Sequence, residues 1–183
     1  MNWEAVGQLL EQNVPVTKLW HFAIGEFGDT GVARLAAALA KNTMLKELDF
    51  DNGSYGDSGI TAKGAARLAL ALETNTTLME LKIDGNKNIG DEGAAHMAVA
   101  LEKNRAVTKL NLSGNGIRFE GAARLAAALE KNTTLTSLRV DLSKPGEYRA
   151  KARERELKKR IHTALNRNEQ AAVCAPPSKK QKR

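Results

Sequence analysis

The chain has 183 residues, of which 27% are charged and 42% are hydrophobic, so we expect a folded domain with a sizeable core and not a disordered chain. No run of about 18 apolar residues occurs that could cross a membrane. The first residues lack the basic and apolar segments of a secretory signal. The single cysteine, Cys174, excludes an intramolecular disulfide and fits a reducing compartment.

The formal net charge of +7 is concentrated at one end of the chain. Residues 144–183 contain 13 Lys or Arg and 4 Asp or Glu, whereas residues 1–143 contain 15 and 17. The basic isoelectric point therefore gives no reason to expect nucleic-acid binding by the rest of the chain. One alternative, that residues 144–183 bind nucleic acid, predicts a steep dependence on salt.

An internal repeat organises the body of the chain, residues 16–143. A helical motif typified by GAARLAAALEKN begins at Gly31, Gly64, Gly93 and Gly121. A block of the form L-x-x-L-x-(apolar), typical of a short strand, begins near residues 16, 45, 78, 107 and 135. Repeats at a regular interval indicate a stacked architecture.

In chain order, residues 1–15 come first and are expected to form a capping helix, half of a repeat. Val6 and Leu10 stand there where Leu35 and Leu39 stand in the first full copy. Each strand block that follows is apolar at its first, fourth and sixth positions, which suits a strand with one buried face. Each helical motif carries one apolar stripe, and its Asn is expected to end the helix. One strand and one helix cannot bury this surface alone, so the units must stack.

The predicted fold class is therefore α/β. It is a right-handed α/β solenoid with a parallel sheet on its concave side and helices on its convex side. Pro145 and Gly146 interrupt the pattern at the end of the repeats. Residues 144–168 are then expected to form a charged C-terminal capping helix, and residues 169–183 a disordered basic tail.

The repeat resembles that of the ribonuclease-inhibitor-like class of leucine-rich repeat proteins, through its LxxLxL strands and its GAxxLAxALxxNxxL helices. The resemblance covers nearly the whole chain before the tail and implies a horseshoe that hosts many kinds of binding. That class usually carries Asn at the ninth position of each block, where the side chain bonds the loop backbone. Here only Asn86 and Asn115 do, so looser loops are expected at Ile24, Gly53 and Ser143.

The order of a leading helix, five strand-helix units, a charged helix and a basic end is similar to the C-terminal domain of tropomodulin. The segments KPGEYRAKARERE, LNRNEQ and KKQKR are loosely comparable with the end of that domain, although the order of Pro and Gly differs. This resemblance implies actin binding at the filament pointed end as an alternative function. A further alternative is a GTPase-activating regulator of the Ran type, which uses the same repeat but has a longer array and an acidic tail.

The exposed strand positions are the candidate binding site, and the favoured function is a non-catalytic protein–protein interaction module. Trp20 is its expected anchor, and acidic residues recur at the seventh position of the blocks. The alternatives are a solvated face without a partner, or a first repeat in which Trp20 or Phe22 turns inward. The predicted partner-contacting residues are Trp20, Glu47, Asp49, Asp51, Glu80, Lys82, Asp84, Lys109, Asn111, Arg139 and Asp141.

No enzyme motif occurs in the sequence, so the chain is predicted not to be an enzyme and to need no cofactor or metal. The three histidines are far apart in the sequence and do not share a position in the repeat: His21, His96 and His162. Residues 51–64 are longer than their counterparts, and they are either a partner-binding insertion or an extra helical turn.

The last residues of the chain are basic. Lys179, Lys180, Lys182 and Arg183 form a candidate nuclear import signal, and the alternative is a solubilising tail that binds anions without specificity. We therefore expect a monomeric protein of the cytoplasm, the nucleus or both.

Overall fold

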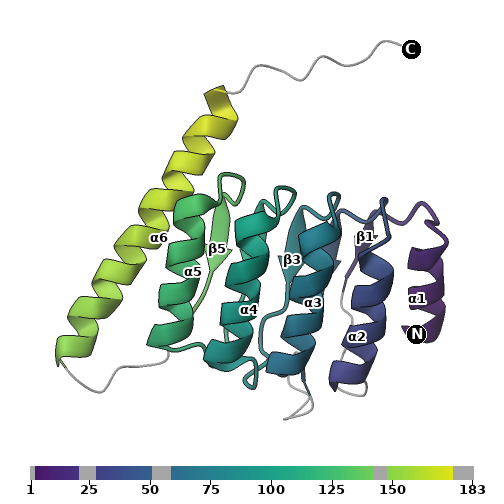
Figure 1. Cartoon of the computed structure of the whole chain (residues 1–183), viewed down its shortest axis with the longest axis horizontal. Helices are drawn as coiled ribbons and strands as arrows, with labels where there is room; N and C mark the ends of the chain where they lie inside the picture. Colours follow the sequence, from purple (N-terminus) through teal and green to yellow (C-terminus); the bar gives the residue numbers. More distant parts are fainter. Residues whose placement is uncertain (1–2, 21–27, 51–58, 142–147, 175–183) are drawn as a thin grey trace.

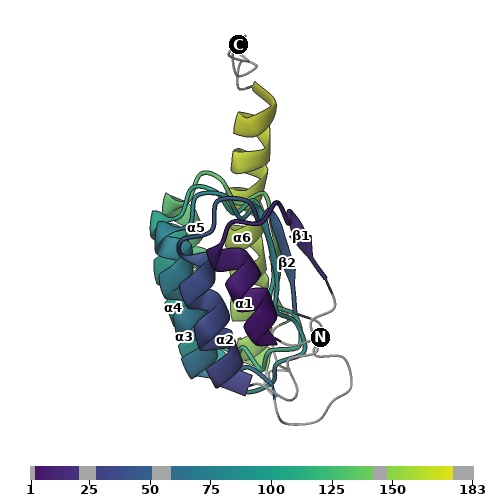
Figure 2. The ribbon, with the colours of Figure 1, turned by 90° about the vertical axis from the view of Figure 1, so that its right-hand side faces the viewer.

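The computed structural model describes residues 3–20, 28–50, 59–141 and 148–174 (Figure 1). Five parallel strands form one sheet in the order β1-β2-β3-β4-β5, and helices form a layer along one of its faces (Figure 2). The predicted α/β solenoid is confirmed. The elements are, in chain order, α1 (Trp3–Glu11), β1 (Lys18–Leu19), α2 (Gly28–Leu39), β2 (Glu47–Asp49), α3 (Ala62–Thr74), β3 (Glu80–Lys82), α4 (Gly90–Lys103), β4 (Lys109–Asn111), α5 (Phe119–Lys131), β5 (Ser137–Arg139) and α6 (Tyr148–Cys174).

The core lies between the sheet and the helix layer, because each strand and each helix buries one side. At the fourth strand position, Leu48, Leu81 and Leu110 are at most 2% exposed. The helices add residues such as Leu68 and Leu125 to the same core, and both are fully buried. Burial of each such leucine contributes about 1.5–3 kcal/mol, so its repetition along the stack drives folding.

Four buried asparagines lie where helices end, and together they form a row that we name the asparagine ladder. In the middle of the row, Asn104 Nδ2 donates to the carbonyls of Leu72 (2.7 Å) and Asn75 (3.0 Å) in the preceding repeat. Its Oδ1 accepts from the N–H groups of Ala106 (2.9 Å) and Val107 (2.8 Å). The asparagine ends its helix, as predicted, and also ties it to the repeat before. The members of the ladder are Asn42, Asn75, Asn104 and Asn132.

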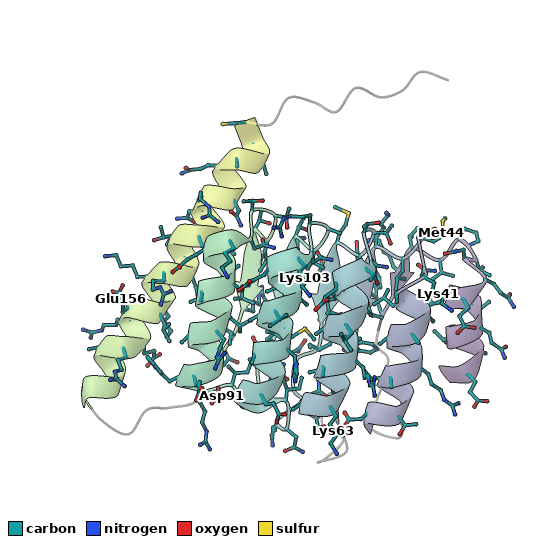
Figure 3. All side chains as sticks on the ribbon, viewed as in Figure 1. Lys41, Met44, Lys63, Asp91, Lys103 and Glu156 are labelled. Atoms are coloured by element: carbon teal, nitrogen blue, oxygen red, sulfur yellow. The ribbon has the colours of Figure 1, made fainter. Side chains whose placement is uncertain are left out.

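Two aspartates at the start of helices cap the neighbouring helix instead of their own. Asp29 in α2 accepts from the N–H groups of Thr61 (2.8 Å) and Gly64 (3.0 Å), where α3 begins. Asp91 in α4, labelled in Figure 3, makes the same pair of bonds to the start of α5, at 2.7 and 2.9 Å. A helix N-terminus attracts negative charge, so an acidic side chain is favoured here. Only the stacked structure shows which helix each aspartate caps.

The helix α6 lies beside α5, where a further repeat would place its helix (Figure 1). Asn168 Nδ2 donates to the carbonyl of Asn132 at 3.0 Å, which extends the asparagine ladder into α6. Arg160 forms an ion pair with Glu130 of α5. The helix ends at Cys174, six residues beyond the expected end of the capping helix at residue 168. These residues contain no glycine or proline and so continue the helix.

Several predictions concern segments outside the described residues, among them most of the 51–64 insertion and the loops expected to be looser. The residues in question are His21, Phe22, Ile24, Asp51, Gly53 and Ser143, and the import-signal candidates Lys179, Lys180, Lys182 and Arg183. In the part of the chain that is described, no helix is long and apolar enough to cross a membrane.

Candidate binding surface

The helices lie along one face of the sheet, and the described chain leaves the opposite face, which we name the open face, without a covering element (Figure 2). The third and fifth strand positions point to it, as the two-residue period of a strand predicts. The structure therefore brings together every predicted contact residue that lies in the described segments. The side chains of the open face are Lys18, Trp20, Glu47, Asp49, Glu80, Lys82, Asp84, Lys109, Asn111, Ser137, Arg139 and Asp141.

Charged side chains of the open face are paired across neighbouring strands. The register places Lys18 opposite Glu47, and their Nζ and Oε1 atoms are 2.8 Å apart. Lys82 Nζ lies 3.1 Å from an oxygen of Asp49 on the neighbouring strand and 3.4 Å from an oxygen of Glu80 on its own strand. Exposed pairs of this kind contribute roughly 0–1 kcal/mol each, so they order the surface more than they stabilise the fold.

Two of these pairs shift the pKa of a member. The hydrogen bond from Lys18 is the main reason that the pKa of Glu47 is lowered, so this pair forms above the ordinary carboxyl pKa and is lost as the pH falls through the lowered value. The pKa of Lys82 is raised, chiefly by its hydrogen bond to Asp49. This second pair is present below the ordinary lysine pKa and is lost as the pH rises through the raised value.

Replacement of Lys18 by glutamine is expected to raise the pKa of Glu47 toward its ordinary value, because the hydrogen bond from the ammonium group and its charge are lost. A carboxyl-detected NMR titration measures this directly. Lys41→Gln is the matched control, since Lys41 is an exposed lysine on the helix side of the molecule (Figure 3). An identical Glu47 titration in the Lys18 variant and the wild type would contradict the assignment.

The two acidic residues at the seventh position that the structure describes, Asp84 and Asp141, are engaged within the chain. Asp84 Oδ1 accepts from Asn111 Nδ2 at 2.9 Å. Asp141 Oδ2 accepts from the N–H of Gly114 at 3.1 Å. A partner that contacts this row must compete with these bonds, so the row offers less free charge than the sequence suggested.

Trp20 and Arg139 differ from the paired charges. Trp20 is 55% exposed, and Lys18 Nζ lies 5.2 Å from the centroid of its ring. The alternative in which Trp20 turns inward is therefore wrong: as a fifth-position residue, it follows the strand alternation and points to the open face. Arg139 is exposed and, among the described residues, makes no ion pair.

In the described segments, no group of three or more His, Cys, Asp or Glu side chains could hold a metal ion. His96 on α4 and His162 on α6 are both exposed. The sequence analysis missed the lateral pairing of the open-face charges. Opposite signs at the same block position, as in Lys18 and Glu47, were the signal that could have revealed it.

Comparison with known proteins agrees with this architecture. A family model described as Leucine Rich repeat matches residues 74–98 and 103–126. A search of curated protein sequences gives no match.

Two solved structures share the fold over nearly the whole chain. One, titled Leiomodin-1 Actin-Binding Site 2, has a TM-score of 0.80 and 20% identity over 94% of this chain and 92% of that chain. The other, the tropomodulin C-terminal domain of Caenorhabditis elegans, has a TM-score of 0.76 and 14% identity over 94% and 96%. The chain therefore contains leucine-rich repeats at residues 74–98 and 103–126, and it resembles the tropomodulin C-terminal domain in its fold.

Proposed function

We propose that the chain is a non-catalytic protein-interaction module whose partner binds the open face. The observation that carries this proposal is the 55% exposure of Trp20 at one end of the uncovered sheet. Parallel sheets are ordinarily covered on both faces, so an open face is unusual for this arrangement of strands. Tryptophan and arginine are the residues that most often dominate binding energy in protein interfaces.

The charge pairs of the open face also bear on what kind of partner fits. The carboxylates of Glu47, Asp49 and Glu80 already have lysine partners, so a partner that relies on charge alone must exchange one exposed ion pair for another. Within the described residues, Arg139 makes no ion pair, and Trp20 contacts only Lys18 and Glu47 of the open-face charges. We therefore expect these two residues to contribute most to binding.

The test is a quantitative affinity capture from cell extract with the tagged full chain. The variant carries Trp20→Ala and Arg139→Ala, and the control carries Lys63→Ala and Arg67→Ala, exposed positions of α3 on the helix side. We expect a partner set that the first variant loses at least tenfold and the control keeps, at equal melting temperature, because Trp and Arg anchors typically cost about 2 kcal/mol or more when truncated. Equal capture by both variants would contradict binding at the open face.

Actin is the specific candidate partner, and the observation in its favour is the similarity of fold to the structure titled Leiomodin-1 Actin-Binding Site 2. Co-sedimentation with purified filaments and elongation of pyrene-labelled actin test it with the full chain. Slower elongation at micromolar protein would support actin as the partner. No sedimentation and unchanged elongation would dismiss actin and leave the interaction module with another partner.

We also propose that α1 and α6 cap the two ends of the stack. Val6 and Leu10 of α1 and Leu157 and Ile161 of α6 support this, because each is buried although it lies in an end helix.

A further inference from the structure

The sequence Val-Thr-Lys-Leu occurs twice, at residues 16–19 and at residues 107–110, and the two copies lie in different surroundings. The second copy contains the start of β4, which has β3 on one side and β5 on the other. The first copy contains β1, which lies at the edge of the described sheet and has only β2 beside it. The contacts that β3 makes with the second copy therefore indicate what the first copy is suited to bind.

The strand β3 holds the second copy through the backbone and side chains of Thr108 and Lys109. Both N–H groups donate to the carbonyl of Met79, at 2.8 and 3.0 Å. The Thr108 hydroxyl donates to the same carbonyl at 3.1 Å. Lys109 Nζ lies 3.4 Å from the carboxylate of Glu80. A single Met-Glu dipeptide on β3 thus receives four contacts from the Thr-Lys pair.

The counterparts of these groups on β1 point outward from the edge of the sheet, away from β2. They are the N–H groups of Thr17 and Lys18 and the Thr17 hydroxyl, and within the described chain no strand lies on that side to accept from them. Further along, the Ile83 N–H donates to the Asn111 carbonyl at 3.1 Å, and the counterpart acceptor on β1 is the carbonyl of Trp20. The end view in Figure 2 shows β1 as the outermost strand.

The apolar residues of the first copy are also less completely buried than those of the second. Val16 and Leu19 are half-buried, whereas Val107 and Leu110 in the second copy are at most 2% exposed. The inner strand is covered from both sides, and the edge strand from one. A further strand beside β1 would remove this apolar surface from water, which is favourable.

The positive charge of Lys18 favours a partner segment that carries a carboxylate. Lys18 already bonds Glu47 at 2.8 Å, but a lysine of this face can hold two carboxylates, since Lys82 contacts both Asp49 and Glu80. On the side away from β2, Lys18 is therefore suited to bind a second carboxylate. This carboxylate would take the position relative to Lys18 that Glu80 has relative to Lys109.

We propose that β1 is the docking edge for an extended segment of a protein partner, which adds in parallel to the sheet as β3 adds to β4. The segment has the form Leu-x-Glu-Leu, with its glutamate opposite Lys18. A second copy of this chain is a poorer occupant, because its own sheet edges carry Lys18 and Ser137 at that position and offer no carboxylate. Pro15 has no N–H, so the pairing begins at Thr17 and the interface is short. This proposal goes beyond the proposed function, because it uses the backbone edge of β1 that no described strand pairs with, although it shares Lys18 with the open face.

The probe is a capped synthetic peptide, TLMELKID, which copies residues 77–84, added to the ¹⁵N-labelled full chain. We expect saturable binding with slower hydrogen exchange of the Thr17 and Lys18 amides, because they become hydrogen-bonded. Lys18→Glu is expected to weaken binding roughly tenfold or more, since it places like charges opposite each other. A peptide in which Lys replaces Glu is expected to restore binding to that variant.

N-methylation of single residues in the peptide provides a sharper control, because it removes one backbone N–H at a time. N-methylation of the peptide isoleucine removes the N–H that faces the Trp20 carbonyl, and we expect binding to fall at least tenfold. N-methylation of the preceding lysine removes an N–H that points away from β1, and binding is expected to match that of the parent peptide. Equal binding of both methylated peptides, or resonance shifts confined to residues outside 16–20, would overturn the proposal. A peptide-free dimer with Thr17 and Lys18 already protected would also overturn it, by assigning the edge to a second copy.

Discussion

Replacement of Asn104 by alanine is expected to lower the free energy of unfolding by about 3 kcal/mol or more, although the residue touches no candidate binding surface. Its side chain makes two donor bonds to the preceding repeat and accepts two from its own turn, and it is 3% exposed. Alanine would leave the buried carbonyls of Leu72 and Asn75 without these donors. Each buried polar group that loses its partner costs about 1–3 kcal/mol.

Urea unfolding of the variant and the wild type measures this loss. Asn104→Asp keeps an acceptor oxygen for the turn but replaces the amide donor with a second oxygen, so it separates the donor bonds to the preceding repeat from the bonds within the turn. Thr133→Ala, at an exposed position directly after the ladder residue Asn132, is the control and is expected to change stability by less than about 0.5 kcal/mol. A loss below about 1 kcal/mol for Asn104→Ala would show that the ladder is not a principal tie between repeats.

Gly121→Ala is expected to destabilise the chain by about 2 kcal/mol, although alanine is the better helix former. A Cβ atom at this position would lie 2.6 Å from Asp91 Oδ1 and 2.9 Å from the Cβ of Ala94 on the neighbouring helix. The Asp91 carboxylate also accepts from the Gly121 N–H at 2.9 Å, so movement of the aspartate away from the new methyl group would weaken the cap of α5.

Gly7→Ala is the matched control, because it makes the same change in α1 where a Cβ would meet nothing within 4 Å. There the gain in helix propensity acts alone, and we expect stability to rise by about 0.5–1 kcal/mol. Thermal unfolding of both variants under one condition gives the comparison. A rise for both would show that the helices have room at the repeat glycine, contrary to the close packing described above.

The order of elements follows from local patterns, which is why it was predictable. Leu78, Leu81 and Ile83 alternate with polar residues over a few positions, and each helix repeats its apolar stripe within its own two turns. Such periodicity needs no knowledge of distant residues. The fold class and the sides of the strands were therefore predicted correctly. The length of α6 was not, because the tail was expected to begin at residue 169, whereas the first helix breakers, Pro176 and Pro177, stand just beyond Cys174.

The candidate surface was predictable only as a set of positions. Strand alternation placed Trp20 and Arg139 on the exposed side, but the pairing of Lys82 with Asp49 joins residues 33 positions apart in the chain. The same holds for Asp84, whose carboxylate is held by Asn111 of the next strand. The contacts between stacked repeats thus decide which charged side chains remain available to a partner.

By itself the sequence determined that strands and helices alternate, which face of each is apolar, and that the units must stack to bury those faces, because these properties are set by residues close together in the chain. Only the tertiary structure decided which groups the recurring polar residues bond to. It shows that Asn104 bonds the preceding repeat and that Asp91 caps the following helix. It also shows that Val-Thr-Lys-Leu is enclosed at β4 and open at β1. Identical local sequences differ there because hydrogen bonds and ion pairs require partners that stacking alone brings within reach.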